Sequence, residues 1–171
     1  LDNNKAEDTW AAMEETTAYL MNELLKGVVT SGTGTEARIS GITVAGKTGT
    51  TSNLYDRYFV GYTGYYCAAV WVGYPDFNEV ISYNKGNPAA DLWYLVMSQV
   101  HEGLEDKPFF DRPEGLVRVT TCTTSGLLAG DSCTGTQTVW VVSGTAPTET
   151  CTAHQTVEIC TESEMLAGPY C

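Results

Sequence analysis

The first third of the chain changes from a helical to a strand-like pattern of apolar positions. Between residues 14 and 29, apolar side chains such as Leu20, Leu24 and Val28 recur at intervals of four, which predicts a helix with one apolar face. Polar residues and glycines at 30–35 then predict a loop that ends this helix.

Three β-rich stretches follow this loop, at residues 42–51, 57–63 and 65–74. They combine Val, Tyr, Phe and Thr and are separated by short turns, which is typical of consecutive strands. We expect an antiparallel sheet, because a parallel pair would need a longer crossover between its strands.

A second helix is predicted from Asn87 to about Glu105, with Asn87 as its cap and Pro88 at its first position. Its expected buried face is Leu92, Leu95, Val96, Val100 and Leu104. The order of a helix, three strands and a helix predicts an α+β fold in which helices flank an antiparallel sheet.

The last third of the chain has a different composition. Residues 111–115 are interpreted as a linker, and short strand-like stretches at 116–121 and 138–142 are separated by Gly, Ser, Thr and Cys. We therefore predict two domains, residues 1–110 and a small β-rich tail at 111–171. A tail of this size, at about 55 residues, would need disulfide cross-links to hold a fold alone.

Charge and hydropathy exclude some classes of partner. The 171 residues carry a formal net charge of −12 and contain no basic tract, so nucleic acid is not an expected partner. No apolar run reaches the roughly 18 residues of a membrane span. Because Leu1 is not an initiator Met, we interpret the N-terminus as a cut and expect any membrane anchor to lie upstream.

Cysteines are concentrated in the tail. Five of the six lie there: Cys122, Cys133, Cys151, Cys160 and Cys171. Clustered cysteines in Thr- and Gly-rich loops predict disulfides and an oxidising compartment. Cys122–Cys133 is the preferred pair and Cys151–Cys160 the next, which leaves Cys171 unpaired or paired elsewhere.

A zinc site is the alternative interpretation of the tail. Cys151 and His154 have the two-residue separation found in many zinc sites. A second closely spaced pair of ligands is absent, so disulfides are favoured and no metal is predicted.

The stretch Lys47-Thr48-Gly49 lies on the first predicted strand and continues as Thr50-Thr51. Serine acyl-transfer enzymes of the penicillin-binding and β-lactamase type combine Ser-x-x-Lys, Ser-x-Asn and Lys-Thr-Gly elements. A lysine ammonium and threonine hydroxyls suit the recognition of a carboxylate, and a glycine admits a neighbouring backbone.

The residues around this motif extend the match. Similar segments appear in order at 18–22, 28–35, 44–51, 59–63 and 69–74. Together they resemble the class A, bifunctional penicillin-binding proteins over about residues 12–110. Residues 125–129 and 144–147 continue the resemblance more loosely into the tail.

The resemblance implies a fold and an activity. The fold would be part of the penicillin-binding and serine β-lactamase-like architecture. The activity of the intact protein would be D,D-transpeptidation of peptidoglycan stem peptides through a serine acyl-enzyme, which penicillin and other β-lactams would also acylate. No cofactor is implied, and the site would face outward from the bacterial cell membrane.

The resemblance also implies roles for individual residues. Lys47 would bind the substrate carboxylate, and Thr48 and Thr50 would contact it. Gly49 would leave room for the substrate, and the Thr50 backbone amide would form half of an oxyanion hole. Their strand should be a sheet edge along which an extended peptide can lie.

Two departures limit what the chain alone can do. No Ser-x-x-Lys or Ser-x-Asn precedes Lys47, so the isolated chain is predicted to be inactive. Ser82-Tyr83-Asn84-Lys85 satisfies both patterns but lies on the wrong side of Lys47 and leads into a turn, so we reject it as a nucleophile.

The second departure concerns the sheet. Two strands from an earlier part of the family's domain are missing beside the stretch 65–74. That strand should have an unpaired edge and uncovered apolar surface, through which copies of the chain are expected to associate. The remaining alternatives are a β-lactamase-like hydrolase fragment and a non-catalytic module that binds cell wall or protein.

Overall fold

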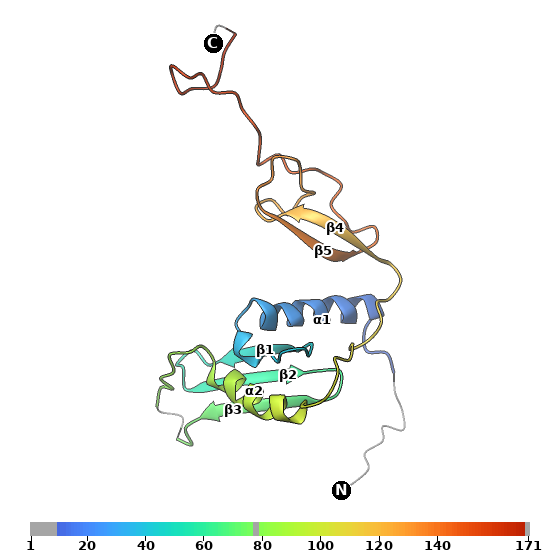
Figure 1. Cartoon of the computed structure of the whole chain (residues 1–171), viewed down its shortest axis with the longest axis vertical. Helices are drawn as coiled ribbons and strands as arrows, with labels where there is room; N and C mark the ends of the chain where they lie inside the picture. Colours follow the sequence, from blue (N-terminus) through green and yellow to red (C-terminus); the bar gives the residue numbers. More distant parts are fainter. Residues whose placement is uncertain (1–9, 77–78, 170–171) are drawn as a thin grey trace. The chain divides into compact units, whose positions relative to one another are not determined.

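The computed structural model describes residues 10–76 and 79–169. The chain divides into two compact units, Leu1–Pro113 and Glu114–Cys171, which are described separately (Figure 1). None of the helices in the described ranges is long and apolar enough to cross a membrane.

The first unit is a three-stranded antiparallel sheet with helices, as the sequence predicts. The strand order is β1-β2-β3, so β1 and β3 are the two edges of the sheet. Its elements are α1 (Glu15–Thr30), η1 (Thr35–Ala37), β1 (Ala45–Thr50), β2 (Asp56–Tyr62), β3 (Cys67–Gly73) and α2 (Pro88–Val100).

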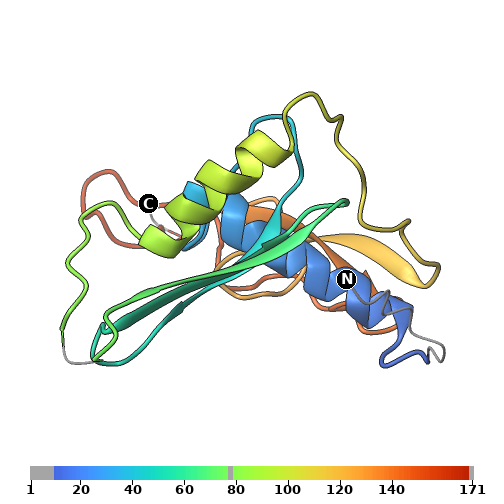
Figure 2. The same ribbon diagram turned by 90° about the horizontal axis from the view of Figure 1, so that it is seen from below.

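Helix α2 covers one face of the sheet (Figure 2). The buried rings of Phe59 and Trp93 meet edge to face with centroids 5.3 Å apart, and the Trp93 indole donates to the Ala68 carbonyl at 3.1 Å. A β-carbon at Gly61 would lie 2.5 Å from the Phe59 ring and 3.0 Å from that of Trp93. The lack of a side chain at Gly61 is therefore what allows the helix to pack so close.

The buried face of α2 differs from the predicted one. The helix ends at Val100, short of the predicted end near Glu105, so Leu104 lies beyond it. Its buried residues are Ala89, Ala90, Trp93 and Met97, whereas the other four residues of the predicted face are exposed. Two small alanines bring the helix close to the sheet, and one large ring then fills the interface. The predicted cap is confirmed, since the Asn87 side chain accepts from the Ala89 amide at 2.9 Å.

The opposite face of the sheet is largely open. Helix α1 packs against β1 and reaches this face at Tyr62, whose hydroxyl donates to the Asn22 side chain at 3.0 Å. Beyond that contact, Tyr58, Val60 and Trp71 remain 42%, 47% and 44% exposed. In the described part of the chain β3 pairs only with β2, so the predictions of an unpaired edge and uncovered apolar surface are confirmed.

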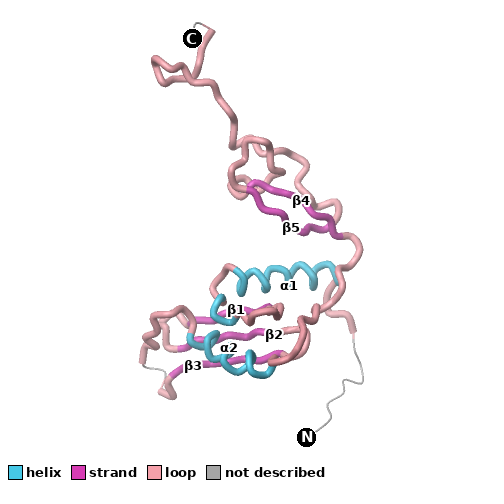
Figure 3. The backbone as a smooth tube through the Cα atoms, in the orientation of Figure 1, coloured by secondary structure: helices cyan, strands magenta, loops and turns pink. Residues whose placement is uncertain are grey.

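The second unit has little regular structure. Strands β4 (Leu116–Cys122) and β5 (Thr136–Val142) form an antiparallel pair, and the rest is loop (Figure 3). Among its described residues only Thr121, Cys122 and Cys151 are buried. This unit therefore lacks the apolar core that the first unit has.

Candidate functional site

Strand β1 places the Lys47–Thr50 motif on an edge of the sheet. Its register with β2 sets Lys47 opposite Val60 and Thr50 opposite Arg57. The hairpin turn that fixes this register is held by the Thr51 hydroxyl, which accepts from the Asp56 amide at 3.0 Å.

The outer backbone groups of β1 follow from the same register. The Thr51 amide donates to the Asp56 carbonyl at 3.2 Å, and inward-bonded residues alternate with outward-facing ones along an antiparallel edge. The amides of Thr48 and Thr50 therefore point away from β2, toward the outer edge of the sheet. The Lys47 ammonium donates to the Thr48 carbonyl at 3.0 Å, which fits this outward orientation.

Lys47 is an exposed cation on the open face of the sheet. Its side chain shares that face with Val60 and Ala69, which lie in line across the strands. Within the described residues no carboxylate lies at ion-pair distance from it. The ammonium is therefore available to an anionic ligand.

The two threonine hydroxyls of β1 have different partners. The Thr48 hydroxyl lies 2.7 Å from that of Thr33, in the loop after α1. The Thr50 hydroxyl accepts from the Arg57 guanidinium at 3.2 Å, so its own proton is free to donate to a ligand. Arg57 was not among the residues predicted from the sequence, although its place opposite Thr50 across the short hairpin could have indicated it.

Gly49 has a neighbour within the sheet itself. A β-carbon there would lie 3.0 Å from the β-carbon of Tyr58 on the next strand. Part of the space beside Gly49 is therefore already occupied by the protein.

Ser82 does not begin a helix. It is exposed in a loop with no helical turn, and the next helix starts at Pro88. This geometry agrees with its rejection as a nucleophile, which needs a lysine one helical turn away.

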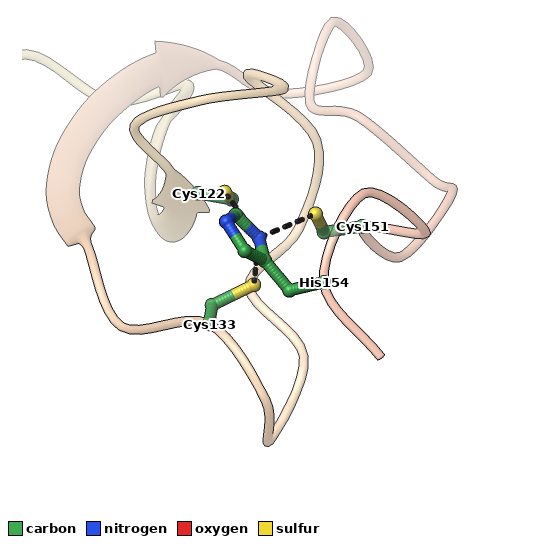
Figure 4. A group of neighbouring side chains, drawn as sticks. All are labelled: Cys122, Cys133, Cys151 and His154. Atoms are coloured by element: carbon green, nitrogen blue, oxygen red, sulfur yellow. Dashed lines mark hydrogen bonds between the residues drawn. The ribbon is translucent and has the colours of Figure 1, made fainter. Parts of the chain in front are cut away.

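The cysteines of the second unit contradict the predicted disulfides. Cys122, Cys133 and Cys151 are free thiols, so neither the Cys122–Cys133 pair nor the Cys151–Cys160 pair forms. Cys160 is in a disulfide, and Cys171 lies outside the described residues. The three thiols converge on the imidazole of His154 instead of pairing with one another (Figure 4).

The environment of Cys122 favours a thiolate. The backbone amide of Ser125 is the largest cause, and with that of Thr124 it lowers the pKa of the Cys122 thiol to about 6. The second unit thus contains three free thiols and one disulfide-bonded cysteine, Cys160, among its described residues.

Two family models match the chain. The penicillin-binding protein transpeptidase domain matches residues 3–90, and the C-terminal domain of penicillin-binding protein 1A matches residues 112–156. The first match covers more than half of the chain, and the second includes the three thiols and His154.

Curated relatives carry the same name. Penicillin-binding protein 1A of Clostridium perfringens (strain ATCC 13124) is 32% identical over 165 residues, covering 93% of this chain and 20% of that protein. Its namesake from Clostridium tetani is 35% identical over 151 residues, covering 83% of this chain and 19% of that protein. The chain thus spans about a fifth of the length of these relatives.

A solved structure supports the fold. The crystal structure of penicillin-binding protein 1A from Haemophilus influenzae matches with a TM-score of 0.64 and 20% identity. The match covers 81% of this chain and 22% of that one.

Proposed function

The chain belongs to the penicillin-binding protein transpeptidase family, and from that premise we propose that it supplies the substrate-binding strand of a peptidoglycan D,D-transpeptidase. In the proposed reaction, a serine outside this chain attacks the penultimate D-Ala carbonyl of a stem peptide and expels the terminal D-Ala. An amine of a second stem then attacks the acyl-enzyme, which forms the cross-link and releases the serine. Penicillin would acylate the same serine.

The observation that carries this proposal is the edge position of β1. Its outward amides and the exposed Lys47 ammonium lie along the outer border of the sheet, where Thr50 is exposed as well. An extended peptide can add to such a border as a further strand. Lys47 then attracts the terminal carboxylate, and the Thr50 hydroxyl donates to it while accepting from Arg57.

The Thr50 amide completes the proposed chemistry. An outward N–H on a rigid strand can stabilise the oxyanion that forms when the carbonyl is attacked. The second donor of the hole would be the amide of the serine itself. Thr48 supports the strand through its contact with Thr33 and supplies a second hydroxyl near the carboxylate.

The open face of the sheet points to the missing part of the domain. Tyr58, Val60 and Trp71 present apolar surface beside an unpaired β3 edge. We propose that the earlier part of the transpeptidase domain covers this surface in the longer protein, outside the bacterial cell membrane. In the isolated chain the same surface would pair two copies, and a monomer by light scattering would contradict that pairing.

Acylation by a fluorescent penicillin tests the proposed role of β1. In the longer protein, Lys47→Ala should slow acylation by about 100-fold, equivalent to about 2.7 kcal/mol of transition-state stabilisation. Lys85→Ala, in the loop before α2, is the matched control and should acylate at the normal rate. Normal acylation of the Lys47 variant would contradict the proposal.

The isolated chain provides a second readout. It should remain unlabelled by the fluorescent penicillin, because the nucleophile is proposed to lie elsewhere. Stable labelling that disappears in Ser82→Ala would show that the rejected serine is the nucleophile.

A further inference from the structure

The second unit holds its fold with almost no buried apolar surface. The core cluster of the chain, which includes Phe59 and Trp93, belongs entirely to the first unit. Of the buried residues described in the second unit, Cys122 is fully buried and Cys151 is 8% exposed. A unit of roughly 60 residues without an apolar core needs another source of stability.

Three sulfurs and one nitrogen meet at the centre of this unit (Figure 4). The Nδ1 atom of His154 lies 3.5 Å from the Cys122 sulfur, 3.7 Å from the Cys133 sulfur and 3.5 Å from the Cys151 sulfur. All four atoms lie within 4.8 Å of one another. The cluster is therefore a single group and not a set of separate pairs.

These distances match those of a tetrahedral zinc centre. Zinc binds sulfur at about 2.3 Å and imidazole nitrogen at about 2.0–2.1 Å, so ligand sulfur and nitrogen atoms lie about 3.6 Å apart around it. The three observed separations, 3.5, 3.7 and 3.5 Å, fall around that value. A disulfide would join only two of the sulfurs and would leave the third beside the imidazole.

The backbone after Cys122 forms a tight turn that directs an amide toward the Cys122 sulfur. Cys122 ends β4, and its carbonyl accepts from the Gly126 amide at 2.8 Å. Gly126 has a φ of +73°, a conformation that glycine adopts without strain. The Thr124 amide points back and donates to the Cys122 sulfur at 3.4 Å, and such contacts orient and stabilise a ligating thiolate.

Cys133 and Cys151 come from separate segments, which backbone hydrogen bonds hold close to this turn. The Cys133 amide donates to the Gly130 carbonyl at 3.0 Å, which forms a second tight turn. The Cys151 amide donates to the Leu128 carbonyl at 2.8 Å, so the third segment is hydrogen-bonded directly to the first. Segments distant in sequence thus bring their side chains to one point.

We propose that Cys122, Cys133, Cys151 and the Nδ1 atom of His154 bind one Zn²⁺ ion that holds the second unit together. Four protein ligands fill the tetrahedral shell and leave no position for substrate, so the site is structural. Binding releases to solvent whatever protons the cysteine thiols still carry, and the ion replaces the missing apolar core as the source of folding free energy. This inference does not depend on the proposed transpeptidase role.

Metal analysis of the 171-residue chain tests the site. Purified with a reductant and without chelator, the chain should carry one zinc per molecule by elemental analysis. Cys133→Ser and His154→Ala should each lower its zinc affinity at least 100-fold in competition with a chromophoric chelator. Cys67→Ser, which removes an exposed thiol of the first unit, is the matched control and should keep one zinc per chain.

Cobalt provides a spectroscopic readout that does not depend on the variants folding. One equivalent of Co²⁺ added to the metal-free, reduced chain should give the intense visible bands of tetrahedral cobalt and thiolate-to-cobalt charge transfer. Zinc content that is unchanged in the Cys133 and His154 variants would place the ion elsewhere. A reduced chain that binds neither ion, or a disulfide among the three cysteines in the purified protein, would overturn the proposal.

Discussion

The two units of this chain have different interiors and therefore different sources of stability. The first buries Phe59, Trp93 and Met97 between a sheet and a helix, so its stability comes from apolar area and close packing. The second buries two cysteines and a threonine among its described residues, and its interior is a cluster of three thiols and one imidazole.

This difference determines what each unit tolerates. An apolar core spreads its free energy over many contacts, so one altered side chain removes only a part of it. A metal centre concentrates the folding free energy in four side chains, so removing one of these ligands can unfold the whole unit. The two units should therefore respond independently to changes aimed at either.

Removing the metal gives the largest expected difference between the units. A chelator added to the reduced chain should abolish the hydrogen-exchange protection of β4 and β5, since zinc contributes about 10 kcal/mol or more to small zinc-dependent folds. Protection of β1–β3 should not change. If β4 and β5 stayed protected in the metal-free chain, the second unit would have another source of stability.

Truncating the centre of the apolar core should give the reverse pattern. Trp93→Ala should destabilise the first unit by about 3–5 kcal/mol, because it leaves a cavity against Phe59. Zinc content and the protection of β4 and β5 should be unaffected. Trp93→Phe is the milder comparison and should cost less, since it keeps a ring against Phe59 while it removes part of the indole and the hydrogen bond to Ala68. A loss of zinc in Trp93→Ala would show that the units are coupled.

A smaller effect concerns acid stability within the first unit. Burial acts to raise the pKa of Asp106, but hydrogen bonds from the Thr43 hydroxyl and amide, at 2.6 and 2.7 Å, bring it below its ordinary value. A lowered folded-state pKa stabilises the fold above the ordinary pKa, and this contribution is lost as the pH falls through the folded-state value.

Asp106→Asn should therefore cost the first unit under about 1 kcal/mol at neutral pH, since the group is exposed. The difference from the unmodified chain should shrink as the pH falls below about 4. Urea unfolding followed through amide signals of β1–β3 at several pH values measures it. A difference that stayed constant with pH would contradict the assigned role of the carboxylate.

Local patterns predicted the elements and the motif strand well. Asn87 and Pro88 determine where α2 begins through their own chemistry, and the three strands follow from short β-rich stretches. The resemblance implied that the strand with Lys47 is a sheet edge, and β1 is indeed an outer strand of the three-stranded sheet.

The partners chosen by individual side chains were less predictable. The predicted apolar face of α2 was wrong because Leu95 is more apolar than Ala89, yet the small alanine is the one that fits against the sheet. The predicted cysteine pairs were wrong because Cys122, Cys133 and Cys151 all gather around His154 as free thiols, and the turns that bring them there are not visible in their spacing. The Cys151-x-x-His154 spacing was the one local signal of the cluster.

The outward-facing backbone of β1 presents hydrogen-bond donors at a fixed spacing. The amides of Thr48 and Thr50 are two residues apart, a separation of about 7 Å along a strand. A ligand that adds to this edge is recognised through its main-chain groups and through the distance between them and its terminal charge. Its side chains project to either side of the strand and are not contacted by these amides. Peptides that differ in their side chains but share the same terminus should then bind this edge with similar affinity. A peptide with a longer or shorter terminus should bind it less well.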